Sequence, residues 1–171
     1  GKNSFGKNCQ LGAQPTGITC KVQEVNKLSF INNQVYPDGR ENLVLDACNN
    51  CVIEGNNFKS YYNGILVLNG NDNTVNKNIF WLTGAVQNQL LDHGDDFGII
   101  NVKGNNNMVA SNSLSCEWAY AGAVTVNAVQ GTGNVFKNCF VDNLESYRVF
   151  LVNAQTEVSN CVSSDKVSIV E

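Results

Sequence analysis

The side chains that could perform acid–base chemistry gather in one short stretch, LDHGDDF at residues 91–97. It holds the only histidine of the chain and three of its fifteen Asp and Glu residues. A carboxyl group whose pKa is raised by a neighbouring charge can give a proton to a leaving oxygen while a second carboxyl group stays ionised. Asp, Gly and His are also common turn residues, so an ordinary solvated turn fits the same letters. The candidate catalytic residues are Asp92, His93, Asp95, Asp96 and Glu117.

The aromatic residues that could bind a substrate share five stretches of the chain. Both tryptophans and all five tyrosines fall within residues 36–42, 59–64, 81–98, 115–122 and 141–148. Aromatic rings stack on sugar faces while charged groups bind the hydroxyls, although such rings can also simply shield the flank of a fold. The candidate substrate-binding residues are Tyr61, Tyr62, Trp81, Trp118, Tyr120, Glu145, Tyr147 and Arg148.

The elements that must position these side chains follow from a repeat. Six segments carry Asn at their fourth position and an apolar residue at their sixth: FINNQV (30–35), IEGNNF (53–58), VNKNIF (75–80), VASNSL (109–114), VFKNCF (135–140) and EVSNCV (157–162). The aligned residues are Asn33, Asn56, Asn78, Asn112, Asn138 and Asn160. A period of about 22 residues suits one turn of a parallel β-coil. An Asn at the same corner of every turn can adopt the left-handed backbone conformation and hydrogen-bond the Asn stacked on it in the next turn. The repeat therefore predicts an all-β solenoid of about six turns with an Asn ladder at one corner.

A second strand precedes each later copy of the repeat. These strands are LVL (43–45), ILVL (65–68), IINV (99–102), AVTV (123–126) and VFLV (149–152). The connection leading into each of them leaves the Asn-bearing strand of the turn before. Since equivalent connections leave the same corner, the aromatic stretches are predicted to line one longitudinal face of the coil.

The same register places the acidic residues relative to one another. Strand starts are taken as Ile65, Ile99, Ala123 and Val149. Asp95 and Glu145 then both lie four residues before a strand and two turns apart, about 9.6 Å by strand spacing, with Glu117 near the turn between them. Carboxyl groups about 5–5.5 Å apart serve retaining glycosidases, and those roughly 6.5–9.5 Å apart leave room for an inverting water. An acid–base constellation is the interpretation, with His93 modulating it, binding substrate or capping its loop.

The chain resembles the right-handed parallel β-helix superfamily over roughly residues 18–165, through the Asn repeat. GDDFGIINVKG (94–104) resembles the paired-aspartate segment of polygalacturonases, which points to Asp95 and Asp96, although the His-Gly element and the basic strand of that family are missing. Repeats such as GNNNMVASNSL resemble the inulin fructotransferases. These resemblances imply a carbohydrate-active protein and a homo-oligomer, with a trimer favoured. We expect no cofactor unless the protein is a lyase. Lyases of this fold often use calcium, so the resemblance implies calcium for a lyase.

Composition sets limits on the remaining function classes. The net charge of −4 and the charged fraction of 15% offer no basic surface for nucleic acid. No apolar run approaches the roughly 18 residues of a membrane span, so we expect no membrane partner. The seven cysteines predict an extracellular or secreted location, with at least one thiol unpaired. Asparagine is frequent, yet no Asn-X-Ser/Thr sequon occurs, which favours a bacterial or viral source.

Two features of the cysteines leave alternatives open. Cys48 and Cys51 have the spacing of half a zinc site, but no second such pair exists, so small buried residues or a disulfide fit better and no metal is predicted. Cys139 and Cys161 share one slot in adjacent turns, where a disulfide and two stacked thiols are both acceptable.

A single domain over residues 1–171 is expected, with 1–17 as an N-terminal cap or extension and 81–98 as a long inserted loop forming a wall or lid. The predicted function is cleavage or rearrangement of glycosidic bonds in an extended polysaccharide, by a hydrolase, transferase or lyase. A non-catalytic glycan-binding or structural module, such as a tailspike or adhesin segment, is the alternative. A piece of a longer coil is a third possibility.

Overall fold

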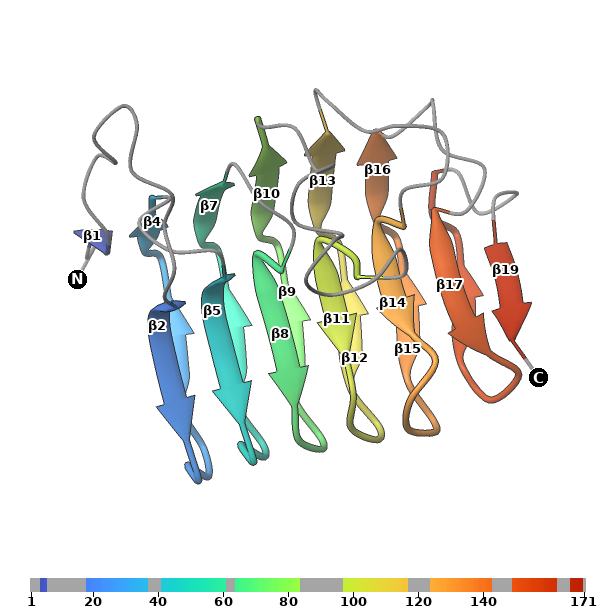
Figure 1. Ribbon diagram of the computed structural model, residues 1–171, viewed down its shortest axis with the longest axis horizontal. Coiled ribbons are helices and arrows are strands. Elements are labelled where there is room, and N and C mark those ends of the chain that lie inside the picture. Colours follow the sequence, from blue (N-terminus) through green and yellow to red (C-terminus); the bar gives the residue numbers. More distant parts are fainter. Residues whose placement is uncertain are drawn as a thin grey trace.

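The chain winds into a parallel β-solenoid whose strands form three long sheets (Figure 1). The computed structural model describes residues 4–5, 18–36, 41–60, 64–83, 97–116, 124–142, 149–162 and 167–170. All the strand pairs in these residues are parallel, and each complete turn adds one strand to each sheet.

The first sheet contains β1 (Ser4–Phe5), β4 (Gln34–Val35), β7 (Asn57–Ser60), β10 (Ile79–Leu82), β13 (Ser113–Cys116) and β16 (Phe140–Asp142). The second sheet contains β2 (Ile18–Gln23), β5 (Glu41–Asp46), β8 (Leu66–Asn69), β11 (Ile100–Val102), β14 (Val126–Ala128), β17 (Phe150–Asn153) and β19 (Val167–Val170). The third sheet contains β3 (Ser29–Ile31), β6 (Val52–Glu54), β9 (Thr74–Asn76), β12 (Met108–Ala110), β15 (Val135–Lys137) and β18 (Glu157–Ser159).

The predicted solenoid is confirmed, with about five turns of roughly 23 residues. Alternate residues of each strand point into the coil, as the period of two requires. In the first sheet the inward column holds Val35, Phe58, Phe80, Leu114 and Val141, all at most 1% exposed. Phe58 and Phe80 stack in adjacent turns with their ring centroids 5.0 Å apart. The core is therefore a set of stacked columns that repeat with the strand spacing.

The predicted Asn ladder is confirmed in four turns. Asn33, Asn56, Asn78 and Asn112 are all buried, and the side-chain amide of each of the first three donates to the Oδ1 atom of the next, at 2.9–3.0 Å. The backbone N–H groups of Asn33, Asn56 and Asn78 donate to the same oxygens at 2.8–2.9 Å. Each carbonyl oxygen thus satisfies two buried donors.

The ladder positions predicted for Asn138 and Asn160 are wrong by one residue. Phe140 pairs with Ser113, so the residue equivalent to Asn112 is Cys139, and Cys161 follows it one turn later. Asn138 and Asn160 instead occupy the preceding position, where φ is 53° and 51°. The left-handed conformation and the ladder bond were assigned to one residue, whereas the structure divides them between two neighbours. Asn suits both positions, so the sequence alone did not separate them.

In the fifth turn a thiol takes over the contacts of the ladder amide. The side-chain amides of Asn56, Asn78 and Asn112 donate to carbonyl oxygens of the turn before at 2.8–3.0 Å. The Sγ of Cys139 lies 3.6 Å from the corresponding carbonyl oxygen, that of Val109. The hydrogen bond from Cys139 lowers the pKa of Cys161 to about 7 and raises the pKa of Cys139. The six described cysteines are free thiols, Cys139 and Cys161 among them.

A second buried ladder, which the repeat did not predict, lies at the corner before the third sheet. Asn73 donates through its side-chain amide to the Oδ1 of Asn107 at 3.0 Å, and Asn107 donates likewise to Asn134 at 3.1 Å. Cys51 begins this ladder, since its backbone N–H donates to Asn73 Oδ1 at 2.9 Å. Cys51 therefore has the role of Cys139 at the other corner, which explains its burial without a metal or a disulfide.

Replacing Cys139 by Asn should raise the free energy of unfolding by about 0.5–1 kcal/mol, because an amide forms stronger hydrogen bonds than a thiol. The backbone already accommodates Asn at this position in four other turns. Asn112→Cys is the reciprocal variant and should lower the free energy of unfolding by a similar amount. Urea unfolding under reducing conditions measures the free energy of unfolding of both variants. A loss of stability in Cys139→Asn, or a gain in Asn112→Cys, contradicts the prediction that an amide stabilises this position more than a thiol.

Candidate functional site

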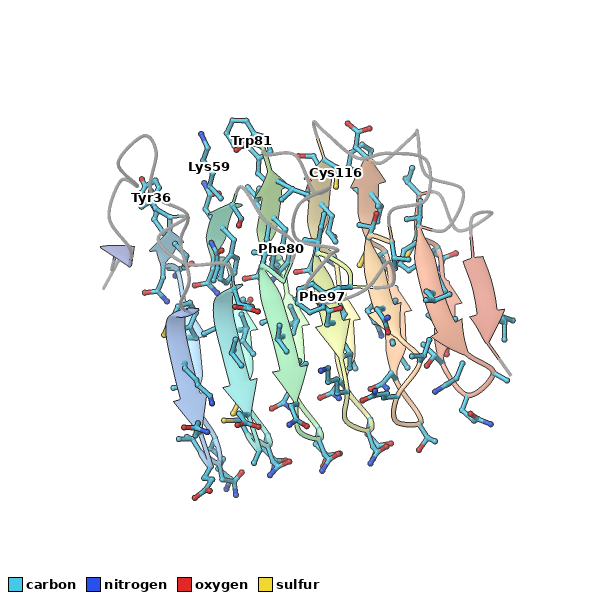
Figure 2. All side chains as sticks on the ribbon, viewed as in Figure 1. Tyr36, Lys59, Phe80, Trp81, Phe97 and Cys116 are labelled. Carbon is cyan, nitrogen blue, oxygen red and sulfur yellow. The ribbon has the colours of Figure 1, made fainter. Side chains whose placement is uncertain are left out.

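The outer face of the first sheet carries a row of chemically distinct side chains. Register places Lys59 opposite Trp81, Trp81 opposite Ser115, and Ser115 opposite Asp142. Tyr36 follows β4 directly and extends the same row beyond Lys59. Figure 2 shows Tyr36, Lys59 and Trp81 along the end of this sheet. The sequence placed Trp81 in a connection, and this assignment is wrong because β10 continues to Leu82.

A surface depression of about 250 Å³ lies at the start of this row. Six of the described residues line it: Gln34, Val35, Tyr36, Asn57, Lys59 and Trp81. Val35 contributes from the core column, and the other five belong to two outward-facing columns of β4, β7 and β10. The lining therefore combines two aromatic rings, two amides and one ammonium group on rigid strands.

Contacts within the depression fix its two aromatic residues. The Nζ of Lys59 lies 4.5 Å from the centroid of the Trp81 ring, a cation–π contact. The Tyr36 hydroxyl donates to Oε1 of Gln34 at 2.8 Å. The buried Asn42 donates to the Lys59 carbonyl oxygen at 2.8 Å and so holds the end of β7. Tyr36 and Trp81 keep 38% and 36% of their surface exposed, so both rings are open to a ligand.

Sequence reasoning named Trp81 as a binding residue but did not assign Gln34 or Asn57 to the site. Both occupy the outward column next to that of Lys59 and Trp81, two residues earlier on their strands. The signal was present as the alternation Gln34-Val35-Tyr36 and Asn57-Phe58-Lys59, polar or aromatic outside and apolar inside. It was missed because binding was assigned to the connections, whereas Gln34 and Asn57 lie inside the repeat segments 30–35 and 53–58.

The far end of the row has different chemistry. Asp142 lies on β16, three strands from Lys59. Next to it, burial and the Asp142 charge raise the pKa of the Cys116 thiol to about 12. Cys116 is thus protonated at neutral pH, so this thiol cannot act as a nucleophile.

The corner beside the row is where the predicted catalytic segment rejoins the coil. Gly98 donates its backbone N–H to the Oδ1 of Asn101 at 2.9 Å, and its carbonyl oxygen accepts from the Asn101 amide at 2.7 Å and from the Gly64 N–H at 2.8 Å. Phe97 packs so close to Gly64 that a Cβ atom there would lie 2.7 Å from the Phe97 ring. The sequence immediately after Asp96 is therefore held firmly.

Most of the predicted site lies outside the described residues. This holds for the candidate catalytic residues Asp92, His93, Asp95, Asp96 and Glu117, and for the candidate binding residues Tyr61, Tyr62, Trp118, Tyr120, Glu145, Tyr147 and Arg148. Of the candidate binding residues, Trp81 lies in the described part of the chain. The strands flanking the connections do share one side, since β7, β10, β13 and β16 all end along the same edge (Figure 1).

One strand start used for the acidic register is wrong by two residues. Val126 pairs with Ile100, and the Ile100 N–H donates to the Thr125 carbonyl oxygen at 3.1 Å, so Thr125, not Ala123, aligns with Ile99. A shift of two residues keeps every side chain on its own face, so the alternation in AVTV could not reveal it. The alignment of Ile99 with Val149, on which the Asp95–Glu145 relation depends, is unaffected.

The described part of the chain contains neither a candidate metal site nor a candidate membrane-spanning helix. No group of three or more His, Cys, Asp or Glu residues there has the arrangement of a metal site. Nor does that part contain a helix long and apolar enough to cross a membrane.

The fold and the row define a parallel β-solenoid with a ligand-sized depression on one sheet. A family model for the right-handed beta helix region matches residues 16–169, and the chain belongs to this family. No protein among the curated sequences compared with the chain matches it.

Solved structures of DFA-IIIase from Arthrobacter chlorophenolicus A6 are similar in fold. The structure in complex with GF2 is 21% identical with a TM-score of 0.73, covering 98% of this chain and 44% of that chain. The structure without its lid in complex with GF2 is 23% identical with a TM-score of 0.75, covering 98% and 42%. The structure without its lid is 18% identical with a TM-score of 0.56, covering 90% and 52%. The chain thus spans about half the length of these proteins.

Proposed function

We propose that this chain is the substrate-binding coil of a carbohydrate-active β-helix protein. The outer face of the first sheet binds an extended saccharide, and carboxylates from the adjoining connections cleave or rearrange its glycosidic bonds. One observation carries the proposal: Tyr36, Lys59 and Trp81 line a depression on adjacent rigid strands, at the sheet edge where the connections begin. Two of the similar solved structures are complexes with the saccharide GF2, which supports a carbohydrate ligand.

The physical fit is to a sugar rather than to a wholly apolar ligand. A sugar ring has an apolar face that packs on an aromatic ring and a rim of hydroxyls that needs donors and acceptors. The depression supplies the rings of Tyr36 and Trp81 together with the amides of Gln34 and Asn57. Because these residues stand on strands, little conformational entropy is lost on binding.

A non-catalytic glycan-binding module is the second candidate, and a specific observation favours keeping it. The binding features stand on the described strands, whereas Asp142, the carboxylate of the described row, is three strands away from Lys59. Binding at the depression therefore requires no neighbouring catalytic group. A homotrimer, an extracellular location and a bacterial or viral source stay predictions, as does calcium in the case of a lyase.

Trp81→Ala should weaken saccharide binding about 10-fold or more, because it removes a ring that lines the depression. Calorimetry with a panel of neutral and acidic oligosaccharides, GF2 included, measures the dissociation constants. Met108→Ala is the matched control, since Met108 is 39% exposed on the outer face of the third sheet. Equal affinities for wild type and Trp81→Ala across every oligosaccharide that binds contradict the proposed site.

A further inference from the structure

We infer that the depression selects a saccharide carrying an anionic group, a carboxylate or a sulfate, and that Lys59 is the residue that recognises it. This inference rests on the proposed function, because it names the class of saccharide that the same site binds. It starts from the charge of the described lining residues: among these six, one is cationic and none is anionic.

Lys59 has a different partner from the two described lysines that form ion pairs. Lys21 pairs with Asp46 at 3.5 Å on the second sheet, and Lys77 pairs with Glu54 at 3.4 Å. Lys59 makes no ion pair with a described carboxylate and instead lies over the Trp81 ring. The next carboxylate along its own row is Asp142, three strand spacings away, which is about 14 Å. At physiological ionic strength an interaction over that distance is largely screened.

The cation–π contact gives the ammonium group a defined position. It holds Nζ at 4.5 Å from the indole centroid, at the wall of the depression, rather than extended into solvent. An ammonium group in this contact still has donors available for an oxygen anion. A sugar that packs against the open ring of Tyr36 would present its substituents to this group.

The polar groups around Lys59 are also biased toward donors. The Tyr36 hydroxyl donates to Oε1 of Gln34, which occupies one of the two lone pairs of this oxygen, and the NH₂ group of Gln34 can donate to a ligand. Asn57 adds a second side-chain amide. Described lining residues that include an ammonium group and amide donors bind oxygen anions better than neutral hydroxyls, because hydrogen bonds to charged groups are the stronger ones.

The test compares matched ligands that differ only in charge. Cello-oligosaccharides and inulin-type oligosaccharides are each used in three forms: neutral, carboxylated and sulfated. Wild-type protein should bind the carboxylated or sulfated form about 10-fold more tightly than the neutral parent, with the difference shrinking as salt is added. The carboxylated and sulfated arms show which anion is preferred.

Variants of Lys59 show whether this residue causes the preference. Lys59→Gln should lower the ratio of the anionic-form affinity to the neutral-form affinity from about 10 to about 1, because it weakens binding of the anionic form more than binding of the neutral form, and Lys59→Arg should restore the ratio. Lys137→Gln is the control, since it removes the same charge from the outer face of the third sheet. Equal binding of neutral and anionic forms by wild type, or a preference that survives in Lys59→Gln, overturns the inference and leaves the proposed function standing. Absence of binding to every form, or binding that Trp81→Ala and Tyr36→Ala leave unchanged, overturns the proposed function itself.

Discussion

Asn78→Ala is expected to lower the free energy of unfolding by about 3–4 kcal/mol, because it interrupts a buried ladder at its centre. The Oδ1 atom of Asn78 accepts two hydrogen bonds from Asn56, one from the backbone and one from the side chain, each at 2.9 Å. The Asn78 amide donates to the Ile53 carbonyl oxygen at 2.9 Å and to Asn112 Oδ1 at 3.0 Å. Alanine removes the hydrogen-bond partner of two buried donors of Asn56 and of the buried carbonyl oxygen of Ile53.

Urea unfolding of Asn78→Ala and of Asn76→Ala measures this effect. Asn76 lies two residues earlier on β9, points outward and is partly exposed, so its replacement should change stability by less than about 0.5 kcal/mol. Asn78→Cys should fall between wild type and Asn78→Ala, as Cys139 occupies the equivalent slot in another turn. Comparable losses for Asn76→Ala and Asn78→Ala contradict a special role of the ladder.

Replacement of the proposed catalytic carboxylate is expected to lower turnover about 10²–10⁴-fold while leaving binding nearly unchanged. The candidates are Asp95→Asn, Asp96→Asn and Glu117→Gln, each of which removes a proton donor or acceptor and keeps the side-chain shape. Gly98 is held by Asn101 and Gly64, two residues after Asp96, so these substitutions should not disturb the coil. Product formation and saccharide affinity are measured on the same preparations.

Asp72→Asn is the matched control for the carboxylate variants. Asp72 lies in a turn between β8 and β9 with φ of 57°, a conformation that Asn also adopts readily. The turnover of the Asp72→Asn variant should equal that of wild type. Wild-type turnover in all three carboxylate variants would exclude these carboxylates as the catalytic groups. No turnover by wild type on any saccharide that binds would instead support a non-catalytic glycan-binding module.

Measurements of turnover, of saccharide binding and of anion preference test the proposed enzyme, the proposed binding site and the role of Lys59 separately. Loss of turnover with retained binding in one carboxylate variant supports an enzyme, and loss of binding in Trp81→Ala supports the depression as its binding site. The anion preference tested through Lys59 is independent of turnover. Each proposal therefore has a measurement that the others do not affect.

Errors in the sequence interpretation follow the periodicities of the fold. The strand start at Ala123 was wrong by two residues because alternation with a period of two is unchanged by that shift. The ladder position at Asn138 was wrong by one because both neighbouring corner positions accept Asn, one through its backbone and the other through its amide. The second ladder through Asn73, Asn107 and Asn134 was missed because the turns that carry it vary in composition.

By itself, the sequence determined the parallel coil and the ladder at Asn33, Asn56, Asn78 and Asn112. A repeat fixes which residues stack, since every turn must pair with the next at one strand spacing. Tertiary structure alone decided that β7 and β10 extend through Lys59 and Trp81, and that these two residues meet Tyr36, Gln34 and Asn57 around one depression. The physical reason is that the length of each strand is set by pairing with its neighbours, which a single strand's sequence does not contain.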